Sequence, residues 1–249
     1  MATADPRNII PVADAAALAK VAADRILARM ADNNGQIAIC LTGGSTPKAL
    51  FEQLATDAYR TRIPWQRVHW FMSDERFVPA SDSRNNMATA RGILLDRFAP
   101  SSHIHPIPTD TATSIDDAAA QYETDLKAFY RAASLDPARP LFDLALMGVG
   151  PDGHTASLFP GYPAVDETTR WVVGVPLANV EPFVPRVSVT LPVLASCREM
   201  LFEVSGAGKR AILTRMLSGD NLPASRARSN GETVFLVDAA ALPENARGA

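Results

Sequence analysis

The sequence predicts an α/β protein in which helices flank a mostly parallel β-sheet. Three observations support this fold class. The run FDLALM at 142–147 is nearly all apolar, as expected of a strand that helices cover on both faces. Glycine-rich turns follow two strand-like runs, at 42–47 and at 148–161. Segments with strand and helix patterns also alternate along the chain, which is the order that builds a parallel sheet.

The N-terminal half begins with a helix and then alternates strands with helices. Residues 14–32 carry apolar side chains at helical spacing, and Gly35 ends this segment. We expect a strand at 36–41, the TGGSTP turn and then a helix at 49–55. The elements expected next are a strand at 67–72, helices at 86–98 and 114–133, and the strand at 142–147.

The C-terminal part has shorter elements and more prolines. The elements expected there are strands at 171–175, 187–191, 200–204 and 234–237, with one helix at 207–217. The proline-containing stretches 99–108 and 136–140 are typical of surface loops rather than domain linkers. Residues 1–249 are therefore predicted to form a single domain, with a Rossmann-like sheet and a smaller mixed C-terminal part.

The composition excludes several classes of partner. Of the 249 residues 47% are hydrophobic and 20% are charged, and the formal net charge is -3, so nucleic acid and anionic membranes are not expected partners. No signal peptide and no apolar run of roughly 20 residues is recognised. Cys40 and Cys197 stand in apolar contexts, which favours free thiols in a reducing cytoplasm. An anionic ligand would need a local cluster of basic groups.

The TGGSTP turn is predicted to bind phosphate. Gly43 and Gly44 allow close approach of the backbone, Ser45 and Thr46 add hydroxyl groups, and Pro47 suits the first helical position. The free N–H groups at the start of the following helix attract anions. The turn is neither a Walker A motif nor GxGxxG, which argues against nucleoside triphosphates and dinucleotides.

Charged residues follow the second strand in the segment SDER, 73–76. Because the carboxyl ends of parallel strands converge on one crevice, we expect Asp74 and Arg76 to face the same space as the glycine turn. Glu75 is expected to be a solvated loop charge. Arg84 and Asn86 lie in a segment typical of a helix N-cap, and their side chains suit phosphate or sugar hydroxyls.

The loop GVGPDGHTASLFPG, 148–161, holds the strongest candidate for chemistry. An unperturbed imidazole titrates at about pH 6.5, so His154 is a candidate general base. Asp152 offers a carboxylate two residues away. Two basic residues come later, Arg186 at the start of a strand and Lys209 at the start of a helix, where a lysine suggests a nearby anion. His103 and His105 lack a third ligand at metal spacing and are interpreted as loop residues.

Together these segments resemble the 6-phosphogluconolactonases. The segments that carry the resemblance are LTGGSTP at 41–47, DER at 74–76 with Asn86, GVGPDGHTASLFP at 148–160, the strand at Arg186 and GAGK at 206–209. The resemblance implies hydrolysis of 6-phospho-D-glucono-1,5-lactone, the second step of the pentose phosphate pathway, without metal or organic cofactor.

The resemblance also implies roles for the candidate residues. His154 would activate water, oriented by Asp152 or Asp74, between which the sequence does not choose. The residues that would hold the phosphate are Gly43, Gly44, Ser45, Thr46, Arg186 and Lys209, with Arg76 near the same anion and Asn86 close by. The implied partner is a small sugar-phosphate lactone, and a monomer is compatible with these features.

Two alternatives are weighed against the lactonase. Glucosamine-6-phosphate deaminases and related sugar-phosphate isomerases share the glycine turn and the GxDGH loop. The deaminases, however, carry an acid soon after the histidine, where this chain has SLFP at 157–160. A sugar-phosphate sensor domain, such as those of bacterial repressors, is the non-catalytic alternative. No helix-turn-helix pattern precedes the domain here.

Overall fold

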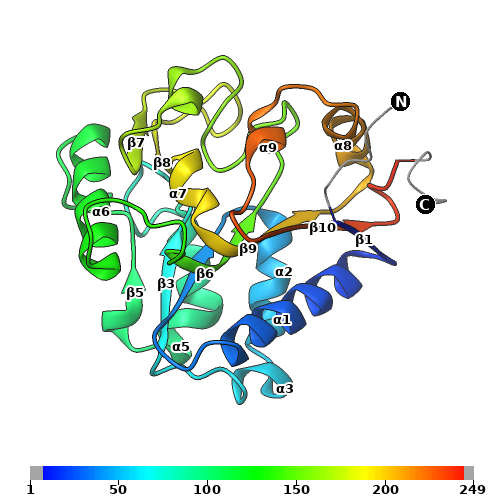
Figure 1. Ribbon diagram of the computed structural model, residues 1–249, viewed down its shortest axis with the longest axis horizontal. Helices are drawn as coiled ribbons and strands as arrows, with labels where there is room; N and C mark the ends of the chain where they lie inside the picture. The colour runs from blue at the N-terminus through cyan, green and yellow to red at the C-terminus, as the bar shows by residue number, and fades with distance from the viewer. Residues whose placement is uncertain (1–7, 244–249) are drawn as a thin grey trace.

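The computed structural model describes residues 8–243, and a parallel sheet runs through its centre (Figure 1). Within that range seven strands pair in the order β1-β10-β9-β6-β2-β3-β5, and each neighbouring pair is parallel. The strands are β1 (Asn8–Val12), β2 (Ile37–Leu41), β3 (Val68–Met72), β5 (Ile104–His105), β6 (Phe142–Met147), β9 (Cys197–Val204) and β10 (Glu232–Asp238). The predicted α/β fold class is confirmed.

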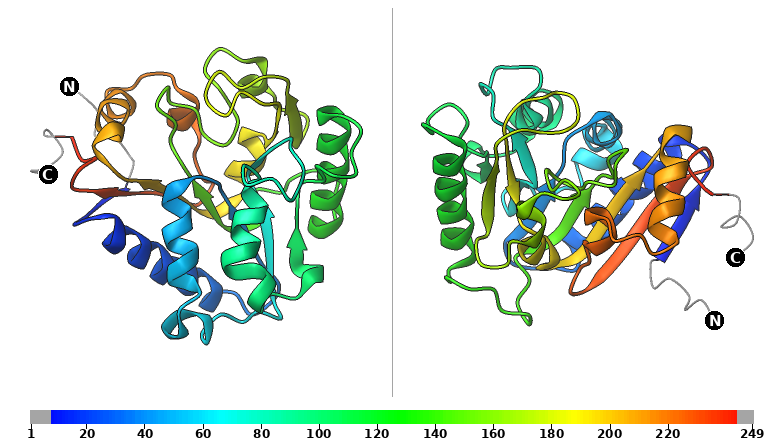
Figure 2. Two further views of the ribbon diagram at one scale, coloured as in Figure 1. Left: turned by 180° about the vertical axis from the view of Figure 1, so that it is seen from behind. Right: turned by 90° about the horizontal axis from the view of Figure 1, so that it is seen from above.

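The helices cover this sheet and connect its strands (Figure 2). They are α1 (Ala15–Ala31), α2 (Ser45–Leu54), α3 (Asp57–Arg60), α4 (Asn86–Ala90), α5 (Asp96–Phe98), α6 (Ile115–Tyr130), α7 (Leu191–Ala195), α8 (Arg210–Leu217) and α9 (Pro223–Arg226). Helix α1 packs across β10, β9 and β6, and α2 packs on both α1 and β9. No helix in the described part of the chain is long and apolar enough to cross a membrane.

A second, smaller sheet accompanies the parallel one, and it is antiparallel rather than mixed. Strands β4 (Asp74–Arg76), β8 (Arg186–Val189) and β7 (Val172–Val175) pair antiparallel in that order, and α6 packs against β7 and β8. Ser73 joins the two sheets, because its N–H donates to Leu41 O at 2.8 Å and its carbonyl accepts the N–H of Val189 at 2.8 Å. The small sheet therefore starts where β3 ends.

Several boundaries differ from the predicted ones. Helix α2 begins at Ser45 rather than at residue 49, so Pro47 is its third residue, where a backbone N–H is still not needed. The helix expected at 86–98 contains a π-helical turn at Arg91–Leu95. The strand expected to reach residue 191 ends at Val189, and Thr190 is the residue that precedes α7.

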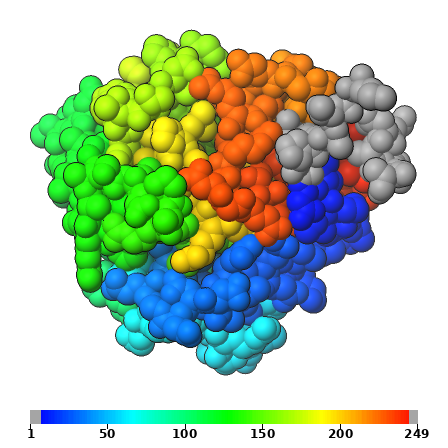
Figure 3. Space-filling model, viewed as in Figure 1, coloured from blue at the N-terminus to red at the C-terminus, as the bar shows by residue number. Residues whose placement is uncertain are grey.

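Strand β1 is an edge strand that the sequence pattern did not reveal. It pairs with β10, so the two ends of the described chain lie beside each other, as the blue and red segments of Figure 3 show. Its residues are half-buried or exposed, and Pro11 lies within it. An edge strand tolerates proline because one row of its N–H groups faces away from the ladder.

The interior strands form the core. Every residue of β2, β3 and β6 is buried. Cys40 and Cys197 are buried free thiols in this layer, and burial raises the pKa of Cys197 to about 12. Because β2, β3, β6 and β9 run in the same direction, their carboxyl ends meet at one edge of the sheet.

Candidate active site

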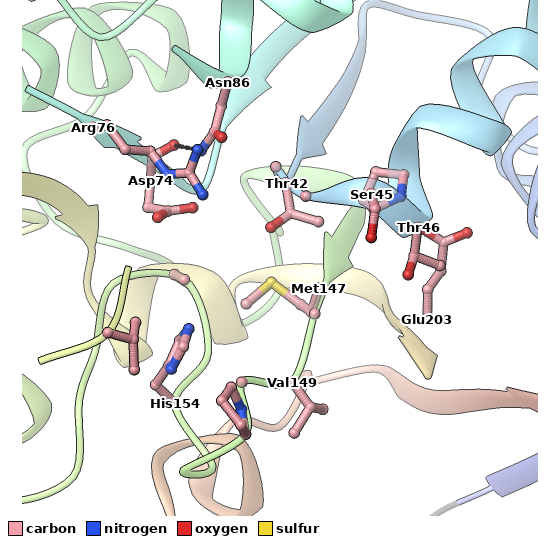
Figure 4. A pocket seen from close by; sticks show the side chains of 18 of the residues that line it. Thr42, Ser45, Thr46, Asp74, Arg76, Asn86, Met147, Val149, His154 and Glu203 are labelled. Atoms are coloured by element: carbon pink, nitrogen blue, oxygen red, sulfur yellow. Dashed lines mark hydrogen bonds between the residues drawn. The ribbon is translucent and has the colours of Figure 1, made fainter. Parts of the chain in front are cut away.

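A pocket of about 410 Å³ opens at this edge of the sheet (Figure 4). Its lining includes most of the predicted site residues, which lie far apart in the sequence. They are Gly43, Gly44, Ser45, Thr46, Asp74, Arg76, Asn86, His154, Arg186 and Lys209. Asp152 lies behind His154 and does not line the pocket itself. The loops after four neighbouring strands thus form one site, as the strand order predicts.

The glycine turn places the start of α2 against the pocket. Gly44 has φ of 115° and precedes the helix, and no side chain caps the first turn. Gly43 lies directly against Asn86, since a Cβ on Gly43 would stand 1.9 Å from Asn86 Oδ1. Ser45 and Thr46 also line the pocket. This arrangement leaves uncapped N–H groups and two hydroxyl groups beside the cavity, which is suitable for an anion.

Asp152 holds His154 in a defined orientation. His154 Nδ1 lies 2.6 Å from Asp152 Oδ1, and the His154 N–H donates to the same oxygen at 3.1 Å. A carboxylate only accepts, so Nδ1 carries the proton of the neutral imidazole, and in that tautomer Nε2 has the lone pair. Figure 4 shows the ring pointing into the pocket, and within residues 8–243 no hydrogen bond is made by Nε2. Burial favours a higher pKa for Asp152, but its bonds with His154 lower that pKa below the ordinary value.

The ring of His154 is also fixed by close packing. A Cβ on Gly150 would stand 2.0 Å from His154 Nδ1, so only glycine fits there. On the other side the centroid of Phe159 lies 4.8 Å from that of the imidazole. Hydrogen bonding and packing together leave the imidazole little freedom to rotate.

Asp74 does not share the orienting role. Its Oδ2 accepts a hydrogen bond from Ser157 Oγ at 2.6 Å, and Oδ1 lies 3.3 Å from Ser73 Oγ. Its carbonyl accepts from Asn86 Nδ2 at 3.1 Å. Asp74 is therefore a buried pocket carboxylate held by hydroxyl groups, and Asp152 is the residue bonded to His154.

Two arginines lie side by side in the small sheet. Arg76 and Arg186 are cross-strand partners, and the Nε of each is buried without a hydrogen-bond partner in the described structure. Burial lowers the pKa of Arg186, Asp74 opposes this change, and Arg76 adds to it. Like charges placed together with free donors favour binding of an anion.

Lys209 supplies a third cation. Its Nζ donates to Val149 O at 2.7 Å, in the loop that carries His154. Burial lowers the pKa of Lys209, and the negative charge of Asp152 partly opposes this effect. Lys209 ends a short 3₁₀ turn, Ala207–Lys209, that precedes α8, so its predicted position at a helix start is confirmed.

The prediction for Glu75 was wrong. Glu75 is fully buried, and its carboxylate accepts the N–H groups of Arg76, Asn86 and Met87. Burial raises its pKa to about 7 against these hydrogen bonds, which lower it. The physical reason is the alternation of β4, in which Asp74 and Arg76 face the pocket and Glu75 faces the start of α4.

Glu203 is a pocket residue that was not predicted, and Arg84 is a predicted candidate that lies outside the pocket. Glu203, in β9, lines the pocket but has no motif around it, so sequence analysis missed it. A charged residue inside the apolar run MLFEV was the available signal. Arg84 does not line this pocket. Its exposed side chain pairs with Asp82 at 2.6 Å and lines a neighbouring groove with Phe183.

The remaining histidines lie away from the pocket. His103 closes a short 3₁₀ turn as a loop residue, whereas His105 belongs to β5. His105 Nε2 lies 2.9 Å from His69 Nδ1, and His103 stacks on His69 at 4.1 Å between centroids. Among residues 8–243 no group of three or more His, Cys, Asp or Glu is arranged to hold a metal ion.

The fold and the pocket define an α/β protein with a pocket lined by basic side chains and an oriented imidazole at the carboxyl ends of its strands. The family is shown by a match of residues 13–235 to the model of glucosamine-6-phosphate isomerases/6-phosphogluconolactonase, and the chain belongs to that family. The resemblance that the motifs predicted is confirmed.

Individual relatives agree with this assignment. The chain is 41% identical over 219 residues to a 6-phosphogluconolactonase of Mycobacterium tuberculosis, covering 84% of this chain and 86% of the relative. A solved 6-phosphogluconolactonase from Thermotoga maritima has a TM-score of 0.80 and 30% identity, covering 93% of this chain and 99% of that one. A monomeric glucosamine-6-phosphate deaminase shares the fold, with a TM-score of 0.78 and 16% identity over 94% of this chain and 98% of that one.

Proposed function

We propose that this protein hydrolyses 6-phospho-D-glucono-1,5-lactone to 6-phosphogluconate in the pentose phosphate pathway. The observation that carries the proposal is the pair His154–Asp152, which presents an unpartnered imidazole nitrogen to a pocket rich in anion-binding groups. The relatives named above support the same activity, since those at 41% and 30% identity are 6-phosphogluconolactonases.

In the proposed reaction His154 acts as general base. Nε2 accepts a proton from water while the water oxygen forms a bond to the lactone carbonyl carbon, and the carbonyl oxygen becomes an oxyanion. When the tetrahedral intermediate collapses, the bond to the ring oxygen breaks and the imidazolium returns its proton to that oxygen. Asp152 stabilises the imidazolium and keeps Nδ1 protonated. Asp152 is thus a positioning residue.

The phosphate is proposed to bind at the start of α2. The N–H groups after Gly44, the hydroxyl groups of Ser45 and Thr46, and the Lys209 ammonium supply donors and positive charge. Arg76 and Arg186 supply further positive charge along the pocket wall. Because the contributing residues run from Thr42 to Lys209, we infer that one domain, the whole chain, carries the activity.

The two cysteines indicate the cellular compartment in which we propose that the reaction takes place. Cys40 and Cys197 are free and buried, and we propose that the protein works in the cytoplasm, where thiols stay reduced.

The test offers two substrates in parallel. Purified, chelator-treated protein is given 6-phosphogluconolactone and, separately, glucosamine 6-phosphate. Acid release above the spontaneous rate is expected with the first and no ammonia release with the second, since residues 157–160 supply a hydroxyl to Asp74 and a ring to His154 rather than an acid. Ammonia release would favour the deaminase, and binding of 6-phosphogluconate without turnover of either substrate would favour the sensor.

A further inference from the structure

Glu203 is a buried acidic residue in the wall of the pocket that the proposed reaction does not use. It is the penultimate residue of β9 and is only 4% exposed. Neither of its carboxyl oxygens has a hydrogen-bond partner within residues 8–243. Buried polar groups are normally paired, so a group of this kind in a ligand pocket indicates that the ligand supplies the partner.

Another glutamate on the same strand shows what a paired carboxylate looks like here. Glu199 is 1% exposed, and both of its oxygens are bound by guanidinium groups, those of Arg25 and Arg29. Glu203 lies four residues further on, so it faces the same side of the sheet as Glu199. Glu203 therefore faces the layer formed by α1 and α2, but no arginine of that layer binds its carboxyl group.

The position of Glu203 places it near the start of α2. Helix α2 packs on β9, and Glu203, Ser45 and Thr46 line the same pocket. Figure 4 shows these three side chains at one side of the cavity, with Asp74, Arg76 and Asn86 at the other. Within the shared pocket, Glu203 therefore lies on the side of the glycine turn, and His154 lies on another side.

The surroundings of Glu203 favour its neutral form. Burial raises the pKa of Glu203 to about 8, and no charged neighbour contributes to that change. The charged groups on the elements around it have other partners: Arg25 and Arg29 of α1 with Glu199 and Glu232, Asp143 of β6 with Asn33 and Arg198, Asp238 of β10 with Ser205, Lys48 of α2 with Glu52, and Lys209 with Val149 O. A neutral carboxyl group has an O–H to donate.

We propose that Glu203 binds the substrate phosphate as a protonated carboxyl group, donating its O–H to a phosphate oxygen at the start of α2. This inference rests on the proposed function, because it assumes a phosphorylated ligand. A phosphate dianion offers only acceptors, so the carboxylic acid O–H complements it, whereas a carboxylate would repel it. Phosphate binding and protonation of Glu203 therefore favour each other.

The consequence is a loss of affinity at alkaline pH. Above the pKa of Glu203, binding of the phosphate requires that Glu203 take up a proton from solution. The Kd therefore rises by up to about tenfold for each further pH unit. Glu203→Gln keeps a hydrogen-bond donor of similar size that does not titrate. Lys209 is present in both proteins, so any titration of its ammonium is common to both profiles and cancels in the comparison.

The experiment measures the Kd of 6-phosphogluconate and of inorganic phosphate by calorimetry between about pH 7 and about pH 9.5. The wild type and the Glu203→Gln variant are compared, with Glu52→Gln as a control that removes an exposed carboxylate of α2. We expect affinity to fall with pH in the wild type and the control, for both ligands, and to fall less steeply in Glu203→Gln, by the part of the pH dependence that Glu203 contributes. Parallel profiles in wild type and Glu203→Gln would overturn the inference.

A second measurement does not depend on the variant folding. Infrared difference spectra of the wild type, recorded on addition of inorganic phosphate at neutral pH, are expected to show a shift of a protonated carboxyl C=O band. No such band would overturn the proposal. A pH effect seen with 6-phosphogluconate but absent with inorganic phosphate would also overturn it, by placing Glu203 on the sugar. Failure of the proposed function is distinct, since then neither turnover of the lactone nor binding of 6-phosphogluconate is found at any pH.

Discussion

Ser157 donates a hydrogen bond from Oγ to Asp74 Oδ2 across 2.6 Å, and so connects the loop of His154 to strand β4. Both residues are buried: Ser157 is fully buried, and Asp74 is 4% exposed. The two residues are 83 positions apart in the sequence. The bond thus joins the loop that carries His154 to the strand that carries Asp74 and Arg76, two segments that both line the pocket.

Replacing Ser157 by alanine is expected to destabilise the fold and to loosen this connection. Asp74 Oδ2 would lose its partner while remaining buried, which costs about 1–3 kcal/mol. Urea unfolding measures the loss. In a double-mutant cycle with Asp74→Asn the two changes should not add, because they remove one shared bond. Simple additivity would contradict the coupling.

Replacing His154 by asparagine is expected to reduce lactone hydrolysis by roughly 10²–10⁴-fold, because the general base is lost. Binding of 6-phosphogluconate should change little, since the anion-binding groups remain. Acid release is measured after subtraction of the spontaneous rate, and affinity by calorimetry. Full activity in this variant would remove His154 from the mechanism.

Replacing Asp152 by asparagine is expected to lower kcat by about 10²-fold or more while KM stays nearly constant. The amide no longer stabilises the imidazolium and can hold the wrong tautomer of His154. Asp74→Asn is the comparison, because Asp74 is bonded to Ser157 and not to the imidazole. An effect of Asp152→Asn confined to KM would argue against an orienting role.

Replacing Lys209 or Arg186 by alanine is expected to weaken binding of 6-phosphogluconate. Each change removes a charged donor from the pocket, and charge-assisted hydrogen bonds contribute about 1.5–3 kcal/mol, or roughly 10–100-fold in affinity. Calorimetry at constant ionic strength measures the change in the Kd of 6-phosphogluconate. Arg84→Ala is the control, since that side chain pairs with Asp82 outside the pocket. Unchanged affinity in both variants would exclude the two residues from the phosphate site.

Acid is expected to destabilise the edge of the sheet through His69 and His105. Burial, with the charge of neighbouring histidines, lowers the pKa of each to about 4 from 6.5. The unfolded chain therefore binds more protons than the folded one between these pH values. Stability is complete above about pH 6.5 and falls as the pH drops toward 4, by on the order of 3 kcal/mol for each residue at most.

Urea unfolding at several pH values between about 7 and about 4 tests this expectation. His69→Asn removes one of the titrating groups, so its free energy of unfolding should depend less steeply on pH than that of the wild type. Equal slopes in the two proteins would show that the acid sensitivity has another source.

The elements that the sequence predicted well are those with one dominant signal. The strand 142–147 was recovered with its bounds because it is buried on both faces, and the turn after β2 was recognised from its glycines. Strand β1 was missed because an edge strand needs no strong apolar pattern. Strand β4 was missed because three polar residues form it only through pairing with β8.

The site residues likewise fall into those that local sequence predicts and those that depend on the fold. Glycine and histidine motifs revealed Gly43 and His154, since local sequence reflects their local backbone. The choice of Asp152 over Asp74 required the fold, because Ser157 is 83 positions from Asp74 and takes up its carboxylate. The burial of Glu75 and Glu203 depends on the strands and helices that pack against them, so it could not be inferred from the residues next to them in the sequence.

The contact between Gly43 and Asn86 has a consequence for engineering this pocket. The amide occupies the space where a side chain on residue 43 would begin, and it also binds Asp74 O. A side chain at position 43 therefore requires a smaller residue at position 86, and a library that varies residue 43 alone would return mostly defective proteins. Val180 and Glu181 line the same pocket from the loop between β7 and β8, outside this contact, so they can be varied independently of it.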